Sequence, residues 1–191
     1  MAESPTDPDH DDAAPAVESV DESGQTQGKI EGQQVEESAR RALEPFERAD
    51  SSDPTAHGPY KIQRELQEMM QDLVGIVRTE EEMQRALEGI DRLWQRASRV
   101  AVTGNREYNP GWHTALDLSN LLTVSEAVTR SAIERKESRG AQFRDDYPEK
   151  AADFGKINVM VKKDGDGTMK VSREPIPEMR AELKQVIEEM G

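Results

Sequence analysis

A run of charged and polar side chains between residues 134 and 148 is the part of this sequence best equipped for specific chemistry. It reads Glu-Arg-Lys-Glu-Ser-Arg-Gly-Ala-Gln-Phe-Arg-Asp-Asp-Tyr-Pro. Arginine side chains such as Arg139 and Arg144 bind carboxylates through paired hydrogen bonds, and Asp145 and Asp146 add acceptors. The pattern favours a protein–protein interface over a catalytic centre. The residues expected to form that interface are Glu137, Ser138, Arg139, Gly140, Gln142 and Arg144.

The quartet Glu137 to Gly140 also fits the C-terminus of a helix. Basic side chains complement the negative end of a helix dipole, and Arg135, Lys136 and Arg139 would serve there. Gly140 would supply the left-handed residue that often follows a helix. Taken alone, the quartet supports a helix C-terminus and a protein–protein interface equally well. The further charges up to residue 146 exceed what a helix end requires, which favours the interface.

Other reactive side chains are sparse. The chain has no Cys, so disulfides, thiolate metal sites and cysteine nucleophiles are excluded. Its three His residues, His10, His57 and His113, lie in unrelated segments without a metal-ligand spacing. No Ser, Cys or paired carboxylate lies near His113 at the spacing of a catalytic motif, so we expect His113 to form local hydrogen bonds. We therefore predict no catalytic, cofactor-binding or metal-binding residue in this chain.

The acidic charge is concentrated at the N-terminus. Residues 1–28 contain eight Asp or Glu and no Lys or Arg, out of a net charge of −14. A negatively charged chain lacks the basic surface that nucleic acids require, so no nucleic-acid partner is expected. The sequence contains neither a basic, apolar signal peptide nor an apolar run of the length that spans a bilayer. We expect a cytoplasmic chain with no membrane span of its own.

Apolar residues recur every three or four positions in five segments, which predicts amphipathic helices. The expected helices cover residues 34–48, 60–78, 80–101, 112–138 and 177–190. Pro59 suits a first helical turn, and Thr79 with Glu82 has the spacing of a capping box. Pro45 is expected to weaken the last turn of the first helix.

Two segments alternate apolar and polar residues instead, at 157–161 and 169–173, which predicts the strands of a β-hairpin. The intervening Asp164-Gly165-Asp166-Gly167 suits a tight turn. It also resembles part of a calcium loop, but the later bidentate Glu of such loops is missing, so the turn is favoured.

Three long helices joined by short links must pack as an antiparallel bundle to bury their apolar faces. The sequence thus predicts a mainly α protein. Its expected parts are a disordered acidic tail (1–33), a short helix and linker (34–58), a three-helix bundle (59–141), and a β-hairpin with a C-terminal helix (142–191).

Several blocks taken together resemble the C-terminal helical domain of succinate dehydrogenase and fumarate reductase flavoprotein subunits. They are Gly-Pro-Tyr-Lys-Ile-Gln-Arg-Glu-Leu-Gln-Glu-Met-Met (58–70), Gly-Ile-Val-Arg-Thr-Glu (75–80), Asn-Pro-Gly-Trp-His (109–113), Ala-Leu-Asp-Leu-x-Asn-Leu-Leu (115–122), Glu-Ser-Arg-Gly-Ala (137–141) and Arg-x-Asp-Tyr-Pro (144–148). L-aspartate oxidase and adenylylsulfate reductase share this domain. The Tyr-Pro closure and the Arg-Glu-Pro tail at 173–175 favour the succinate dehydrogenase branch.

The resemblance implies a spectrin-like bundle that packs on the flavin-binding and capping domains of an enzyme interconverting succinate and fumarate. It also implies covalently held FAD, an iron–sulfur subunit and membrane anchors as neighbours, and a peripheral position at the inner face of the plasma membrane. The family's dinucleotide fingerprint and its substrate-binding residues precede this domain, and no Gly-x-Gly-x-x-Gly occurs here. FAD is therefore expected in a partner or in a preceding part of the protein.

One departure lies inside the match. Family members commonly have His after Glu-Ser-Arg-Gly-Ala, whereas this chain has Gln142, which forms hydrogen bonds but does not titrate. A role that needs a protonated imidazole does not carry over.

Two hypotheses follow. In the first, the chain is the C-terminal scaffold of such a flavoprotein subunit, and its interface residues dock against the flavin-bearing part. In the second, it is a stand-alone helical module for protein–protein interaction without catalysis.

Overall fold

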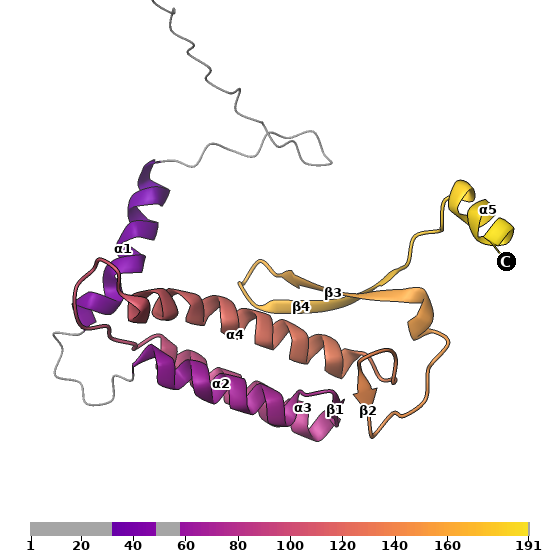
Figure 1. Ribbon diagram of the computed structural model, residues 1–191, viewed down its shortest axis with the longest axis horizontal. Helices are drawn as coiled ribbons and strands as arrows, with labels where there is room; N and C mark the ends of the chain where they lie inside the picture. The colour runs from indigo at the N-terminus through magenta and orange to yellow at the C-terminus, as the bar shows by residue number, and fades with distance from the viewer. Residues whose placement is uncertain (1–31, 49–57, 191) are drawn as a thin grey trace, which may run out of the picture. The chain divides into compact units, whose positions relative to one another are not determined.

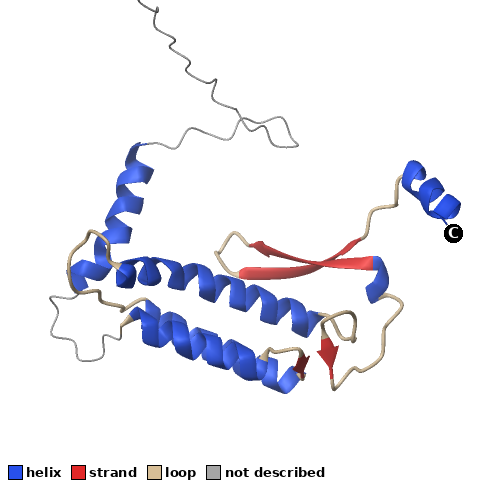
Figure 2. Cartoon of the chain, viewed as in Figure 1, coloured by secondary structure: helices blue, strands red, loops and turns tan. Residues whose placement is uncertain are grey.

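Five helices and two short two-stranded sheets make up the regular structure of residues 32–48 and 58–190, the residues that the computed structural model describes (Figures 1 and 2). The order is α1 (Gly32–Arg48), α2 (Pro59–Leu73), β1 (Val77–Arg78), α3 (Glu80–Ala97), α4 (Pro110–Glu134), β2 (Phe143–Arg144), the 3₁₀ turn η1 (Phe154–Lys156), β3 (Ile157–Lys163), β4 (Met169–Pro175) and α5 (Ala181–Met190). A mainly α fold with a hairpin and a C-terminal helix is thus confirmed.

Helices α2, α3 and α4 form the predicted bundle, and all three pairs of these helices pack against each other. Their apolar faces meet in one core, in which each helix contributes buried side chains at three- and four-residue spacing. The main members are Ile62, Leu66, Ile90, Leu93, Leu118 and Leu122. Trp94 and Trp112 are partly buried and pack against this core.

Local sequence signals define where the bundle helices begin. The Thr79 hydroxyl accepts the Glu82 amide, and the Glu82 carboxylate accepts the Thr79 amide, so the predicted capping box is present. The Asn109 side chain caps α4 by accepting the Trp112 amide at 3.2 Å. Pro59 and Pro110 occupy first-turn positions, where a missing N–H costs nothing.

The predicted C-terminal ends of the bundle helices were wrong. α2 ends at Leu73 instead of 78, α3 at Ala97 instead of 101, and α4 at Glu134 instead of 138. A Cβ atom at Gly75 would lie 2.7 Å from the Gln71 carbonyl oxygen, so only glycine fits where the chain leaves α2. Beyond it, Val77 and Arg78 form β1 and pair in parallel with Phe143 and Arg144 of β2.

The predicted hairpin is confirmed. Strands β3 and β4 pair antiparallel, with Val161 opposite Val171, and they lie along α4 (Figure 2). Gly167 adopts a φ of 88°, which glycine accommodates without strain. The Asp164 and Asp166 carboxylates accept the backbone amides of Gly165 and Thr168, as in a tight turn.

The two terminal helices differ from prediction at their starts. α1 begins at Gly32 instead of 34 and continues through the buried Pro45, while the rest of the predicted disordered tail, residues 1–31, lies outside the described residues. α5 begins at Ala181 instead of 177. Its predicted apolar face is exposed at Leu183, Val186, Ile187 and Met190. The chain divides into two units, 1–41 and 42–191, and the bundle and hairpin belong to the second.

The core predicts a stability difference between two isoleucines. Ile90 is fully buried between the bundle helices, so Ile90→Ala should lower the free energy of unfolding by about 3 kcal/mol through lost burial and a cavity. Ile187 on α5 is 58% exposed, and Ile187→Ala should change the free energy of unfolding by less than about 0.5 kcal/mol. Urea denaturation followed by circular dichroism measures both. Equal effects would contradict this core assignment.

Candidate functional site

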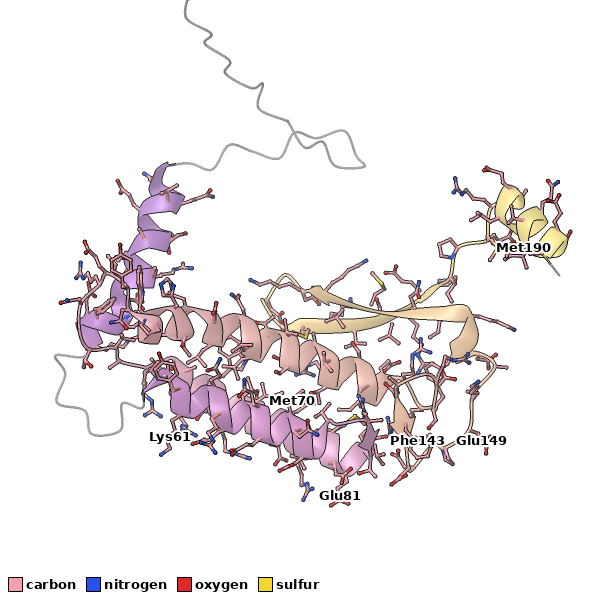
Figure 3. The ribbon with its side chains drawn as sticks, viewed as in Figure 1. Lys61, Met70, Glu81, Phe143, Glu149 and Met190 are labelled. Atoms are coloured by element: carbon pink, nitrogen blue, oxygen red, sulfur yellow. The ribbon has the colours of Figure 1, made fainter. Side chains whose placement is uncertain are left out.

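The pairing of β1 with β2 brings two distant segments together where α2 and α4 end. The Phe143 amide donates to the Ile76 carbonyl at 3.1 Å, and the Asp145 amide donates to the Arg78 carbonyl at 3.1 Å. Figure 3 labels Phe143 at this end of the bundle. The pairing places the charged run of residues 135–151 against the start of α3 and the end of α4.

Arg144 is the buried centre of this region, with a side chain that is 0% exposed. Its Nε and Nη2 atoms donate to the two Asp146 carboxylate oxygens at 2.7 and 2.6 Å, which is the bidentate geometry of strong arginine–carboxylate pairs. Its Nη1 atom donates to the carbonyls of Ala132 at 2.9 Å and Ile133 at 3.3 Å. One guanidinium therefore satisfies carbonyls at the end of α4 that have no partner within the helix.

Asp146 links this arginine to α3. Its Oδ2 atom accepts the Glu80 amide at 2.9 Å, at the first residue of that helix, where a negative charge is favourable. Hydrogen bonding from Arg144 and from the Glu80 amide lowers the pKa of Asp146 to about 2, against the opposing effect of burial. The Glu80 carboxylate in turn lies 3.4 Å from Arg144 and 3.3 Å from the Lys136 ammonium.

Glu137 is the buried carboxylate of this region, and its side chain, like that of Arg144, is 0% exposed. Arg139 donates to it from Nε at 2.9 Å and from Nη2 at 3.1 Å, and Arg135 donates at 2.5 Å. The Ala151 amide donates at 2.9 Å. The hydrogen bonds from Arg139, Ala151 and Arg135 outweigh burial and lower the pKa of Glu137 to about 2. This carboxylate fastens the chain at residue 151 to the segment that follows α4.

Ser138, Gly140 and Gln142 shape the turn between these two carboxylate sites. The Arg144 amide donates to the Ser138 hydroxyl oxygen at 2.8 Å, and that hydroxyl donates to the Tyr147 carbonyl at 2.9 Å. Arg139 and Gln142 pair through both backbone hydrogen bonds, with Gly140 at a φ of 61° between them. The Gln142 amide nitrogen donates to the Arg135 carbonyl at 2.8 Å, a bond that requires no titratable group.

The structure brings all six predicted site residues together, but with two corrections. The helix-terminus interpretation was wrong, because α4 ends at Glu134 and Gly140 lies six residues beyond it. Glu137, Ser138 and Arg144 are buried and bonded within the chain, so their side chains do not face outward. Arg139 and Gly140 are exposed and Gln142 is half-buried, and their docking role stays a prediction.

Sequence reasoning missed Glu80, Arg135 and Arg78 as members of this region. One signal could have found Arg135 and its relation to Glu137. Residues two apart in extended chain lie on the same side, and Arg135, Glu137 and Arg139 follow that spacing. The contribution of Glu80 has no such local signal, because it depends on a pairing between segments 66 residues apart.

Of the other candidates considered from sequence, His10 and His57 lie outside the described residues. His113 is exposed and its ring lies 5.7 Å from that of Trp112, whose Nε1 donates to the Ala42 carbonyl at 2.7 Å. Within residues 32–48 and 58–190, His, Cys, Asp and Glu side chains form no group of three that could hold a metal ion. None of the helices in that part of the chain is both long and apolar enough to cross a membrane.

Comparison with known proteins gives a consistent set of similarities. The family profile described as "Fumarate reductase flavoprotein C-term" matches residues 63–186. An uncharacterized FAD-dependent oxidoreductase of Methanocaldococcus jannaschii is 35% identical over 103 residues, which are 54% of this chain and 18% of that protein. The succinate dehydrogenase flavoprotein subunit of Coxiella burnetii is 38% identical over 93 residues, which are 48% of this chain and 16% of that subunit.

Among solved structures, the Mycobacterium smegmatis Sdh1 complex in the apo form contains a similar domain. Its matching chain superposes with a TM-score of 0.75 at 37% identity, over 83% of this chain and 27% of that one. This chain thus spans about a fifth of the length of the curated relatives first matched, at 18% and 19%.

The buried arginine predicts a large effect of a conservative change. Arg144→Lys keeps the charge but cannot contact Asp146 and the α4 carbonyls at once, and it should lower the free energy of unfolding by about 2 kcal/mol. Arg144→Met leaves Asp146 unpaired and should lower it by about 3 kcal/mol. Urea denaturation measures both changes. A neutral result for Arg144→Met would show that this arginine does not hold the region together.

Glu137 predicts a pH dependence with a defined sign. Its pKa is about 2 in the fold against a usual 4.5, so folding favours the ionised form. The stabilisation is present above pH 4.5 and is lost as the pH falls towards 2. Glu137→Gln should therefore destabilise the protein at pH 6 and do so much less at pH 3, in urea denaturation at the two values. The exposed Glu107→Gln is the control, and parallel curves for Glu137→Gln and wild type would contradict the prediction.

Proposed function

We propose that this chain, which belongs to the fumarate reductase flavoprotein C-terminal family, serves as the helical scaffold of a flavoprotein that interconverts succinate and fumarate. The observation that carries the proposal is the match over residues 63–186, which spans the bundle, the charged turn and the hairpin. Chemistry is assigned to the flavin-bearing part. The part of this chain that the structure describes contributes a rigid surface for it.

The ordered turn after α4 suits that role. The Glu137 and Arg144 bonds form entirely within the chain, so the turn has a set shape before any partner arrives. Arg139 and Gly140 at its surface, with Gln142 beside them, present one guanidinium and backbone groups for docking. A preformed surface loses less conformational entropy on binding than a flexible loop does.

The proposal extends to cofactor and neighbours. FAD would be bound by the flavin-bearing part, in line with the FAD-dependent oxidoreductase among the relatives. An iron–sulfur subunit would be a further neighbour, and the assembly would sit peripherally at the cytoplasmic face of the membrane. The chain itself would bind no nucleic acid.

Mild affinity purification of the tagged chain from its own cells tests the proposal, followed by a denaturing gel viewed for flavin fluorescence. A fluorescent companion band, or fluorescence in a larger product that contains this sequence, is the expected result. A monodisperse chain with no fluorescent companion would overturn the scaffold role and favour the stand-alone interaction module.

Arg139→Ala tests the docking residue within the same experiment. It removes a guanidinium that is 39% exposed and that also donates to Glu137 and to the Ala151 carbonyl. Arg135 and the Ala151 amide still bind Glu137 in this variant. We expect flavin recovery to fall at least about fivefold, and Arg85→Ala, an exposed arginine on α3, to leave it unchanged. Equal recovery for both variants would remove Arg139 from the docking surface.

A further inference from the structure

Arg78 is a partly buried cation without a partner in the described part of the chain. Its Nε atom is buried and has no hydrogen-bond partner, and no carboxylate of the described residues lies within ion-pair distance of its guanidinium. Burial and the neighbouring charge of Arg144 both lower the pKa of Arg78, so its surroundings disfavour the charge it carries. A cation in such a place is normally paired.

The three acids of the charge network are already occupied. Glu137 is bound by two arginines, Asp146 by Arg144, and Glu80 by Arg144 and Lys136. None of the three forms an ion pair with Arg78. The exposed Asp145, whose amide donates to the Arg78 carbonyl, forms none with it either.

Arg78 lines a shallow pocket of about 380 Å³ on the surface. Apolar side chains of α4 and β3, including Val128 and Val159, form part of its wall, and Arg135 and Gln142 add polar groups. Arg135 is bonded to Glu137 and to the Phe154 and Ile157 carbonyls. Arg78 is the cation of this pocket that has no such bonds with the described residues.

Exposed apolar residues lie close to Arg78 in the fold. Val128 lines the pocket and is 45% exposed, and Ile76 and Val77, which precede Arg78 in the chain, are 70% and 56% exposed. Phe143, whose amide bonds to Ile76, is 41% exposed. Exposed apolar groups next to a cation are a feature of binding hot spots, because a partner that covers them keeps water away from the charged contact.

We propose that the Arg78 pocket receives an acidic side chain, Asp or Glu, of the flavin-bearing part, with apolar residues of that part covering Ile76, Val77 and Phe143. The inference rests on the proposed function and adds a specific contact to it. Charge complementarity determines the occupant, because a carboxylate supplies the one group the pocket lacks. A guanidinium paired in this way contributes mainly to slow dissociation.

The variants Arg78→Met and Arg78→Lys separate docking from folding. Removing a partly buried guanidinium whose Nε has no hydrogen-bond partner in the described residues relieves a cost, so Arg78→Met should leave the free energy of unfolding unchanged or raise it. The same variant should lower recovery of the flavin-bearing polypeptide at least about tenfold. Arg85→Met is the matched control. Unchanged recovery, or destabilisation with parallel loss of recovery, would overturn the proposal.

Arg78→Lys identifies the occupant. It keeps the charge and introduces an amine that a carbodiimide links to a carboxylate in direct contact. Mass spectrometry of the crosslinked full assembly should find residue 78 joined to one Asp or Glu of the flavin-bearing polypeptide. Arg85→Lys should give no such product. Wild-type recovery of flavin together with no crosslink at residue 78 would overturn this contact and leave the scaffold role standing.

If no flavin-bearing polypeptide is recovered, an NMR experiment on the chain alone tests the proposed carboxylate site. The arginine Nε–H resonances of the whole chain are followed by NMR while sodium acetate replaces sodium chloride at constant ionic strength. A saturable shift at Arg78, absent at Arg85, would support a carboxylate site independently of the scaffold role. Identical behaviour of the two arginines would overturn it.

Discussion

The bidentate contact between Arg144 and Asp146 is the interaction on which the end of the bundle depends. The arginine also binds the Ala132 and Ile133 carbonyls, and the aspartate binds the Glu80 amide, so one ion pair joins the end of α4 to the start of α3. Burial of a charged pair is costly, and here nearly every donor of the guanidinium is satisfied, which offsets that cost. The β1–β2 pairing is the backbone counterpart of the same connection.

Much of the fold follows from the sequence because helix faces and strand alternation are local properties. The capping box at Thr79, the apolar faces of the bundle helices and the hairpin were predicted from spacing alone. The helix ends were not. Two-residue strands leave no periodic signal, and β1 and β2 are recognised only through their pairing across 66 residues. The residues between α2 and α3 therefore read as a continuation of the helix.

The candidate site shows the same limit. A cluster of Arg, Glu and Asp in sequence normally indicates a solvated surface, and here it contains one buried carboxylate, Glu137, and one buried guanidinium, Arg144. A spacing of two residues places the side chains of Arg135, Glu137 and Arg139 on the same side of the extended chain, and this could have been predicted from the sequence. The sequence could not have predicted that Arg78 forms no ion pair with the described residues, because this depends on which acids the neighbouring bases bind. The main charges of the turn are thus paired within it, while Arg78 beside it forms no ion pair with the described residues.

The central claim is that the turn after α4 is ordered within this chain by its own buried charges, so that it offers a preformed surface. Native-state hydrogen exchange of the full chain tests it most directly. The amides of Phe143, Arg144 and Asp145, which donate to Ile76, Ser138 and Arg78, should exchange nearly as slowly as those of the α4 core. Exchange of these three amides at the rate of unstructured chain would contradict the account.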